Sequence, residues 1–159
     1  IAHNVIPGNI FATLHARLRG NPCRPYNSDT KIRVKVLNQE RFYYPDASIV
    51  CKSNSPNSSY QDHPVTVIEV LSSDTRRTDE GEKKDAYLAI PSLTTYLLVE
   101  QDIAAVVVHR RNAKGFEREV YTGLEASVPL PDFEIELPLS DIYEGVEFTP
   151  ADDQDEASG

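Results

Sequence analysis

Val65-Thr66-Val67-Ile68-Glu69-Val70-Leu71 is an apolar and β-branched run that contains a single carboxylate. This composition is typical of a central strand that is buried on both faces of a sheet. Glu69 is the exception, because an isolated buried carboxylate costs far more free energy than a fold can supply. It must be paired, hydrogen-bonded or bound to a metal ion. The run therefore predicts a central strand that carries one acid into the interior.

An amphipathic helix is predicted near the start of the chain. Apolar residues recur every four positions over residues 6–18, which is the spacing of one helical face. Asn4 is placed as a cap, Pro7 lies near the expected first turn, and Gly20 marks the end of the pattern. We expect this helix to pack its apolar face on the sheet.

A second helix is predicted after the central strand. Asp79 and Glu82 are spaced as a capping box, and the helical pattern continues until Pro91. Most of the remaining chain has strand-like patterns, one of which is interrupted at Pro45. The predicted strands cover residues 31–36, 41–51, 95–100, 104–110 and 116–122, residues 124–131 and 133–137 are either strand or loop, and residues 138–143 suit a short helix.

The order of helix, three strands, helix and further strands predicts an α/β or α+β fold, in which helices pack on a mixed sheet. The 159 residues fit one domain, which we expect to span residues 1–150 and to be followed by a disordered acidic tail at residues 151–159. Because the sequence contains no Met, we expect the native protein to begin upstream of Ile1.

The net charge of −9 counts against tight nucleic-acid binding, since Lys and Arg supply most of the non-specific affinity for phosphates. The argument from net charge is weaker for residues 1–143 than for the whole chain. Six acids and no bases follow residue 143, so residues 1–143 hold 19 acids and 16 bases. No apolar run approaches the roughly 18 residues of a membrane span, so we expect a cytoplasmic protein with no membrane partner.

The sequence lacks the residue patterns that are characteristic of several enzyme classes. Cys23 and Cys51 form no C-x-x-C pair, so we expect two reduced structural cysteines and neither a zinc site nor a disulfide. The four His residues do not have the spacing of metal ligands. The sequence has no glycine-rich phosphate loop and no G-x-S-x-G elbow. Carboxylates at strand positions remain as the candidates for chemistry.

Asp46 and Glu69 are these carboxylates. Asp46 follows Pro45 within a predicted strand and lies 23 residues before Glu69. Two acids on adjacent strands can share a hard divalent cation, because Mg²⁺ needs only one or two carboxylates when phosphate and water complete its coordination. Two other interpretations stay open: Glu69 can form a buried pair with a Lys or Arg, and Asp46 can be a turn or cap carboxylate.

Lys83 is the third candidate. It comes 14 residues after Glu69 and shares the predicted helical face of Ala86, Tyr87 and Ile90, so it should point toward the sheet. An inward lysine beside two carboxylates is typical of a catalytic site. The alternative is a surface salt bridge with Asp79 four residues earlier.

Several stretches resemble one known family when they are taken in order. They are residues 4–18, residues 28–33, Tyr44-Pro45-Asp46-Ala47-Ser48-Ile49-Val50-Cys51, Val67-Ile68-Glu69-Val70-Leu71-Ser72 with Ser73-Asp74-Thr75, Asp79-Glu80-Gly81-Glu82-Lys83 with Tyr87, and Tyr96-Leu97-Leu98-Val99. Their order and spacing, over about residues 1–145, resemble the large bacterial family of uncharacterised, putative restriction endonucleases in the PD-(D/E)XK nuclease superfamily.

The resemblance implies a restriction-endonuclease-like mixed sheet flanked by helices, with an αβββαβ core and an added C-terminal β-hairpin. It implies that Asp46, Glu69 and the main-chain carbonyl of Val70 bind Mg²⁺ or Mn²⁺. Leu71 replaces the lysine that the superfamily usually has two residues after its second acid, so the family's lysine maps to Lys83. The family also has an upstream segment with a further acid, which this chain lacks, and by analogy we expect a homodimer.

These observations predict a metal-dependent endonuclease that hydrolyses DNA. Asp46 and Glu69 would hold the metal ion, and Lys83 would position the attacking water and offset the developing negative charge. The candidates for contacts with the DNA backbone are Lys31, Arg33, Lys35, Arg76 and Arg77, and a solvated face is an equally good interpretation for all five. The alternatives are a catalytically silent nuclease-fold module for interaction or assembly, and a hydrolase of RNA or of a small phosphodiester.

Overall fold

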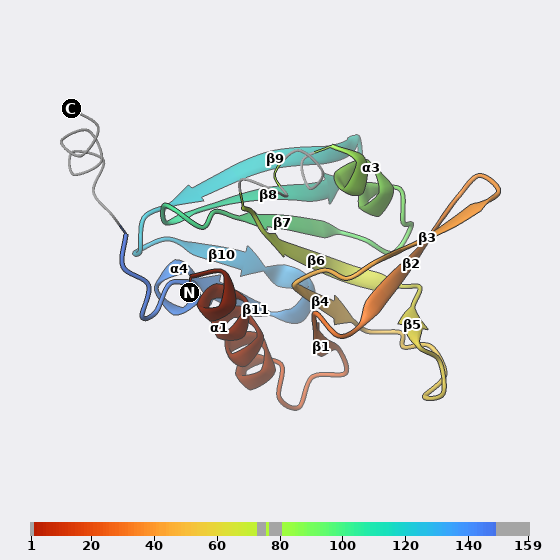
Figure 1. Ribbon diagram of the computed structural model, residues 1–159, viewed down its shortest axis with the longest axis horizontal. Helices are drawn as coiled ribbons and strands as arrows, with labels where there is room; N and C mark the ends of the chain where they lie inside the picture. The colour runs from red at the N-terminus through yellow and green to blue at the C-terminus, as the bar shows by residue number, and fades with distance from the viewer. Residues whose placement is uncertain (1, 73–75, 77–80, 149–159) are drawn as a thin grey trace.

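The predicted central strand is β6 (Pro64–Val70), an interior strand of a six-stranded sheet with the order β1-β4-β6-β7-β8-β9 (Figure 1). The computed structural model describes residues 2–72, 76 and 81–148. All residues of β6 except Val65 are buried. The strand pairs antiparallel with β4 (Ala47–Val50) and parallel with β7 (Thr95–Val99). The prediction of a strand covered on both faces is therefore confirmed.

Two smaller sheets and the helices complete the described part of the chain. The other strands of the large sheet are β1 (Arg24–Asn27), β8 (Ala105–Asn112) and β9 (Gly115–Thr122). A three-stranded sheet holds β3 (Gln39–Tyr43), β2 (Lys31–Val36) and β5 (Tyr60–Gln61), and a two-stranded sheet holds β10 (Ser127–Leu130) and β11 (Ile135–Pro138). The helices are α1 (Ala2–Arg17), α3 (Glu82–Leu88), the 3₁₀ turn η1 (Pro131–Phe133) and α4 (Leu139–Ile142).

The αβββαβ order is present as α1, β1, β4, β6, α3 and β7, and the β8–β9 hairpin extends the same sheet. The predicted α/β (α+β) fold class is confirmed. The identity of the first strand was predicted wrongly: it is β1, whereas residues 31–36 form β2 in the three-stranded sheet. The half-exposed β1, with Pro25 inside it, lacks the alternation that would have revealed it.

The predicted single strand over residues 41–51 is also corrected by the structure. It is two strands, β3 and β4, which belong to different sheets. Proline has no N–H to donate to a ladder, and Pro45 lies in the link between the two strands. The chain crosses from one sheet to the other at this link, so Asp46 lies just before β4. In Figure 1 the β2–β3 hairpin projects from the side of the large sheet.

The large sheet has a hydrophobic core on each face. Ile68 and Val70 lie in the cluster that includes the apolar side of α1, whereas Val67 and Leu71 lie in the cluster that includes Tyr87 of α3. Side chains alternate between the two faces of a strand. Glu69 therefore projects to the α3 face of β6, with Val67 and Leu71.

The helix predictions are confirmed in their main features. Ile6, Ile10 and Leu14 of α1 are fully buried, as predicted, and Leu18 is 1% exposed just beyond the helix, which ends at Arg17 and not at Gly20. Its start was predicted wrongly, because α1 already includes Ala2; Asn4 is therefore not its cap, and Pro7 lies inside the helix. Residues 138–143 contain α4, and residues 124–138 contain β10, η1 and β11. Asp79 of the predicted capping box and the predicted tail at residues 151–159 lie outside the described residues.

The structure overturns the prediction of two reduced cysteines, because Cys23 and Cys51 form a disulfide. β1 and β4 are antiparallel, with Arg24 opposite Val50, so the next pair outward brings the two cysteines together at a Cα–Cα distance of 4.0 Å. A spacing of 28 residues carries no sign of this pairing. It arises only once β1 is recognised as a strand.

Within the described residues, no helix is both long enough and apolar enough to cross a membrane.

We expect the disulfide to stabilise the fold. The two cysteines are 28 residues apart in the sequence, so the cross-link restricts the unfolded chain. The expected contribution to the free energy of unfolding is about 2–4 kcal/mol. Urea unfolding of the protein with and without dithiothreitol should show this loss, and Cys51→Ser should reproduce it. If reduction leaves the free energy of unfolding of the wild type unchanged, the cross-link does not stabilise the protein.

Candidate active site

Asp46 lies opposite Glu69 at the end of the β4–β6 pairing. Ala47 is the partner of Ile68 in the antiparallel register, so the next position outward places Asp46 across from Glu69. Asp46 is half-buried, and its Oδ2 accepts a hydrogen bond from the Val70 N–H at 2.7 Å. The structure thus brings Asp46 directly beside the Glu69–Val70 segment.

The main-chain carbonyl of Val70 is directed to the same edge of β6 as Asp46. Leu71 donates its N–H to Val99 of β7 at 2.8 Å, whereas Val70 donates toward Asp46 on the opposite edge of β6. The N–H and C=O groups of one residue in an extended strand point to the same edge. The carbonyl of Val70 therefore also points to the side where Asp46 lies.

Glu69 is held by α3. Its side chain is only 4% exposed; Tyr87 donates its hydroxyl to Glu69 Oε1 at 3.3 Å, and Lys83 Nζ lies 3.8 Å from the same oxygen. Lys83 and Tyr87 are one helical turn apart, which places them on one face of the helix. The Lys83 side chain is 21% exposed, so it reaches both the buried acid and the solvent.

Three tyrosine rings support this arrangement. The Tyr87 ring packs 5.5 Å from Tyr96 of β7 and 5.4 Å from Tyr43 of β3, and Lys83 Nζ lies 5.8 Å above the Tyr43 ring. Tyr87 is fully buried and fixes the direction of its hydroxyl toward Glu69. This hydrogen bond was not predicted from the sequence. The position of Tyr87, four residues after Lys83, indicates that both side chains point to the same side of the helix.

The oxygen atoms gathered here suit a hard divalent cation. Carboxylates of Asp46 and Glu69 and the carbonyl of Val70 are the kind of donors that Mg²⁺ and Mn²⁺ prefer. No group of three or more His, Cys, Asp or Glu side chains with the arrangement of a metal site occurs in the described part of the chain. A site here would use two acidic side chains and would leave positions for phosphate and water.

The contact between Glu69 and Lys83 also fits the simpler interpretation of a buried ion pair, in which the lysine only compensates the acid. The other alternative for Lys83, a surface pair with Asp79, involves a residue outside the described ranges. The structure therefore places Lys83 beside Glu69, and it places Asp46 beside the Val70 main chain at the position that faces Glu69.

Three of the residues predicted to contact DNA lie on β2, and their side chains differ in their partners. Lys31, Arg33 and Lys35 alternate along β2 with Ile32 and Val34, which are buried. The guanidinium of Arg33 is held by both oxygens of Asp62, at 2.7 Å and 2.8 Å, with Glu40 at 3.4 Å. Most of its donors are therefore directed at acids of the protein.

The two other predicted contacts are Arg76 and Arg77. Arg76 forms an ion pair with both carboxylate oxygens of Glu100. Arg77 lies outside the described residues.

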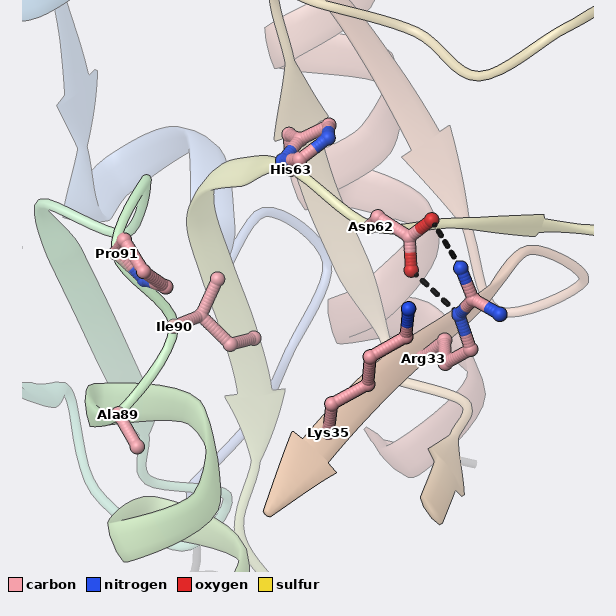
Figure 2. A pocket seen from close by; sticks show the side chains of 7 residues that line it. All are labelled: Arg33, Lys35, Asp62, His63, Ala89, Ile90 and Pro91. Carbon is pink, nitrogen blue, oxygen red and sulfur yellow. Dashed lines mark hydrogen bonds and ion pairs between the residues drawn. The ribbon is translucent and has the colours of Figure 1, made fainter. Parts of the chain in front are cut away.

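A cavity of about 360 Å³ lies at the other end of α3 (Figure 2). Arg33 and Lys35 line it from β2, Asp62 and His63 from the segment before β6, and Ala89, Ile90 and Pro91 from the chain that follows α3. In Figure 2 the amine of Lys35 reaches toward the space between Ile90 and the Arg33–Asp62 pair. Asp46, Glu69 and Lys83 are not among the residues that line this cavity.

A mixed sheet between helices, with two acids at facing positions of adjacent strands, agrees with the predicted restriction-endonuclease-like fold. A family model described as "Putative restriction endonuclease", named Uma2, matches residues 1–140. The chain therefore belongs to the Uma2 family.

The chain is also similar to two individual proteins. The chain is 32% identical over 114 residues to the uncharacterized protein slr1290 of Synechocystis sp., which covers 71% of this chain and 59% of that protein. It is 26% identical over 102 residues to the uncharacterized protein sll1609 of the same organism, which covers 62% of this chain and 56% of that protein. The chain thus spans less than two thirds of the length of either relative.

The fold also matches a crystal structure from Anabaena variabilis, described as a putative nuclease belonging to DUF820. The TM-score is 0.70 at 20% sequence identity, over 89% of this chain and 80% of that one. This likeness shows the shared fold.

We expect the Arg33–Asp62 pair to make stability depend on pH. The hydrogen bonds from Arg33 hold the pKa of Asp62 below its ordinary value. Since the folded pKa is lower than the unfolded one, near 3.9, the stabilisation is present above about pH 4 and is lost as the pH falls through the folded pKa. Urea unfolding should show that Asp62→Asn is less stable than the wild type at neutral pH, and that the difference shrinks on acidification.

The matched control is Glu40→Gln, because Glu40 contacts the same guanidinium at 3.4 Å with a side chain that is 52% exposed. It should lower the free energy of unfolding less than Asp62→Asn does. A difference between Asp62→Asn and the wild type that stays constant from neutral to acidic pH would show that the ionised pair does not stabilise the fold.

Proposed function

We propose that this chain is a metal-dependent nuclease that hydrolyses DNA phosphodiester bonds, with Asp46, Glu69 and Lys83 as its catalytic residues. One observation carries the proposal. The Asp46 carboxylate is hydrogen-bonded to Val70, immediately beside a buried Glu69 whose carboxylate lies 3.8 Å from the Lys83 ammonium. Membership of a family of nuclease-like proteins supports this assignment.

Asp46, Glu69 and the Val70 carbonyl would hold Mg²⁺ or Mn²⁺. When bound, such an ion polarises the scissile phosphate and lowers the pKa of a water molecule that can attack it. Glu69 is prepared for this role because the Tyr87 hydroxyl restricts its orientation. Asp46 is restricted in the same way by the Val70 N–H.

Lys83 would act on the substrate from α3. Its side chain is 21% exposed, so a phosphate could approach it while Glu69 stays buried. A fixed positive charge stabilises the negative charge that develops on the phosphate oxygens in the transition state. It would also orient the attacking water by donating a hydrogen bond to it.

A second candidate function follows from the same contact. If Lys83 only compensates the buried charge of Glu69, the chain is a catalytically silent nuclease-fold module for interaction or assembly. The net charge of −9 favours this alternative, because phosphate binding needs a positive surface. A homodimer and a cytoplasmic location remain predictions under either function.

Cleavage can be tested with supercoiled plasmid in MgCl₂ or MnCl₂. We expect the wild type to nick the plasmid, and Asp46→Asn, Glu69→Gln and Lys83→Ala each to lower the rate by on the order of 100-fold or more, because each removes a charge that acts at the reacting phosphate. Lys84→Ala is the matched control, since Lys84 is adjacent on α3 but turned about 100° away. It should cleave at the wild-type rate.

The same preparations are tested on RNA and on bis(p-nitrophenyl) phosphate. Cutting of these substrates without cutting of DNA would reassign the substrate. If Glu69→Gln cuts as fast as the wild type, or if no substrate is cut with either metal, the catalytic assignment is wrong and the silent module is favoured.

Metal binding can be tested without any activity. A ligand that binds only the folded state stabilises it, by about 2.7 kcal/mol at a concentration 100 times its Kd. We therefore expect Mn²⁺ to raise the Tm of the wild type in a concentration-dependent way, and expect this rise to be lost in Asp46→Asn and Glu69→Gln and kept in Lys84→Ala. An equal rise in all four proteins would place the metal elsewhere.

A further inference from the structure

The three-stranded sheet has a face that does not pack on the core. We call it the outer face and define it by the register. Arg33 is opposite Phe42, Lys35 is opposite Glu40, and Lys31 is opposite Tyr60. Cross-strand partners project to the same side of a sheet. Ile32 and Val34, which alternate with these residues on β2, pack in the core that includes α3.

Aromatic rings and cations are interleaved on the outer face. Lys31 Nζ lies 4.8 Å from the centre of the Phe42 ring, and the Arg33 guanidinium lies 4.3 Å from that of Tyr60. The rings of Phe42 and Tyr60 meet edge to face at 5.7 Å. Phe42 is 43% exposed. A large apolar ring is therefore held at the surface by its neighbours, and belongs to neither core.

The outer face is positively charged although the chain is acidic. It has three bases, Lys31, Arg33 and Lys35, while Glu40 and the nearby Asp62 both contact Arg33. Neither Lys31 nor Lys35 forms an ion pair with any residue that the structure describes. Lys35 also opens onto the cavity at the end of α3, as Figure 2 shows. Two lysine ammonium groups thus remain for an anionic ligand.

We propose that the outer face binds an unpaired nucleic-acid strand, whose bases stack on Phe42 and Tyr60 and whose phosphates contact Lys31 and Lys35. Every base has a flat π surface, so stacking on aromatic side chains, combined with nearby cations, binds single strands with little dependence on sequence. The bases of a duplex are already stacked on one another and cannot use such a surface. The face therefore favours a single strand over a duplex.

The outer face lies on the other side of the hairpin from the candidate active site. Tyr43 of β3 points inward and contacts both Tyr87 and Lys83. Its neighbour Phe42 points outward. A strand bound on the outer face therefore lies on the same hairpin that supports Lys83 and Glu69. The inference deepens the proposed function and rests on it, since it makes the substrate a nucleic acid with an unpaired segment.

Binding is measured by fluorescence anisotropy with a dye-labelled oligothymidylate and a labelled duplex of the same length. The background is Glu69→Gln in EDTA, which excludes cleavage and metal binding. We expect the single strand to bind more tightly than the duplex. Adding Phe42→Leu should weaken single-strand binding by roughly 5- to 150-fold, the range expected for the loss of one base–aromatic stack.

Adding Lys31→Gln or Lys35→Gln should lower the salt dependence, by about 0.7 in the slope of log K against log salt for each lost phosphate contact. The matched control is Val120→Ala, because Val120 is 50% exposed on β9 and lies outside the outer face. It should bind as the background protein does. Circular dichroism and the Tm establish that Phe42→Leu is folded.

Equal affinity for single strand and duplex, or unchanged binding by Phe42→Leu, would overturn the inference. So would a dimer in size-exclusion chromatography that Phe42→Leu abolishes, since the face would then belong to a second copy of the chain. Single-strand binding that depends on Phe42, without cleavage in the plasmid assay, would support the outer face and contradict the proposed catalysis. Metal-dependent plasmid cutting without single-strand binding would support the proposed catalysis and contradict the role of the outer face.

Discussion

The hydrogen bond between the Val70 N–H and Asp46 Oδ2 is the contact on which the candidate active site depends. It joins the end of the interior strand β6 to the link that enters the neighbouring strand β4, where Asp46 and Glu69 occupy facing positions. Like charges at such positions repel each other, and burial raises the cost. The Lys83 ammonium near Glu69 offsets part of this cost, and a divalent cation would offset more of it.

The surroundings of Glu69 connect the site to the rest of the molecule. Tyr87, at the centre of the α3 face, contacts the acid through its hydroxyl and the rings of Tyr96 and Tyr43 through its own ring. Close-packed aromatic side chains leave little room for alternative rotamers. Because Tyr43 belongs to the projecting hairpin, the large sheet, α3 and the three-stranded sheet all meet at one buried acid. Restriction of this kind holds catalytic groups in position before a substrate binds.

Predictions of charged contacts from sequence were less informative than predictions of buried positions. Arg33 was grouped with Lys31 and Lys35 because all three alternate on one strand, yet its guanidinium is directed at Asp62, 29 residues away. The pairing of Cys23 with Cys51 was missed for a similar reason. Both contacts join segments that are distant in sequence, and no local periodicity reports such a pair. The contact between the Phe42 and Tyr60 rings also joins two segments that are distant in sequence.

By itself, the sequence determined the central strand, the two main helices, the fold class and the positions of its unusual acids. These follow from hydrophobic periodicity and from the cost of burying charge, which act over a few residues. Only the tertiary structure decided that β1 is the first strand of the sheet, that residues 41–51 divide between two sheets, and that Asp46 contacts Val70. Strand pairing joins residues that are remote in the chain, so its register depends on how whole faces pack together.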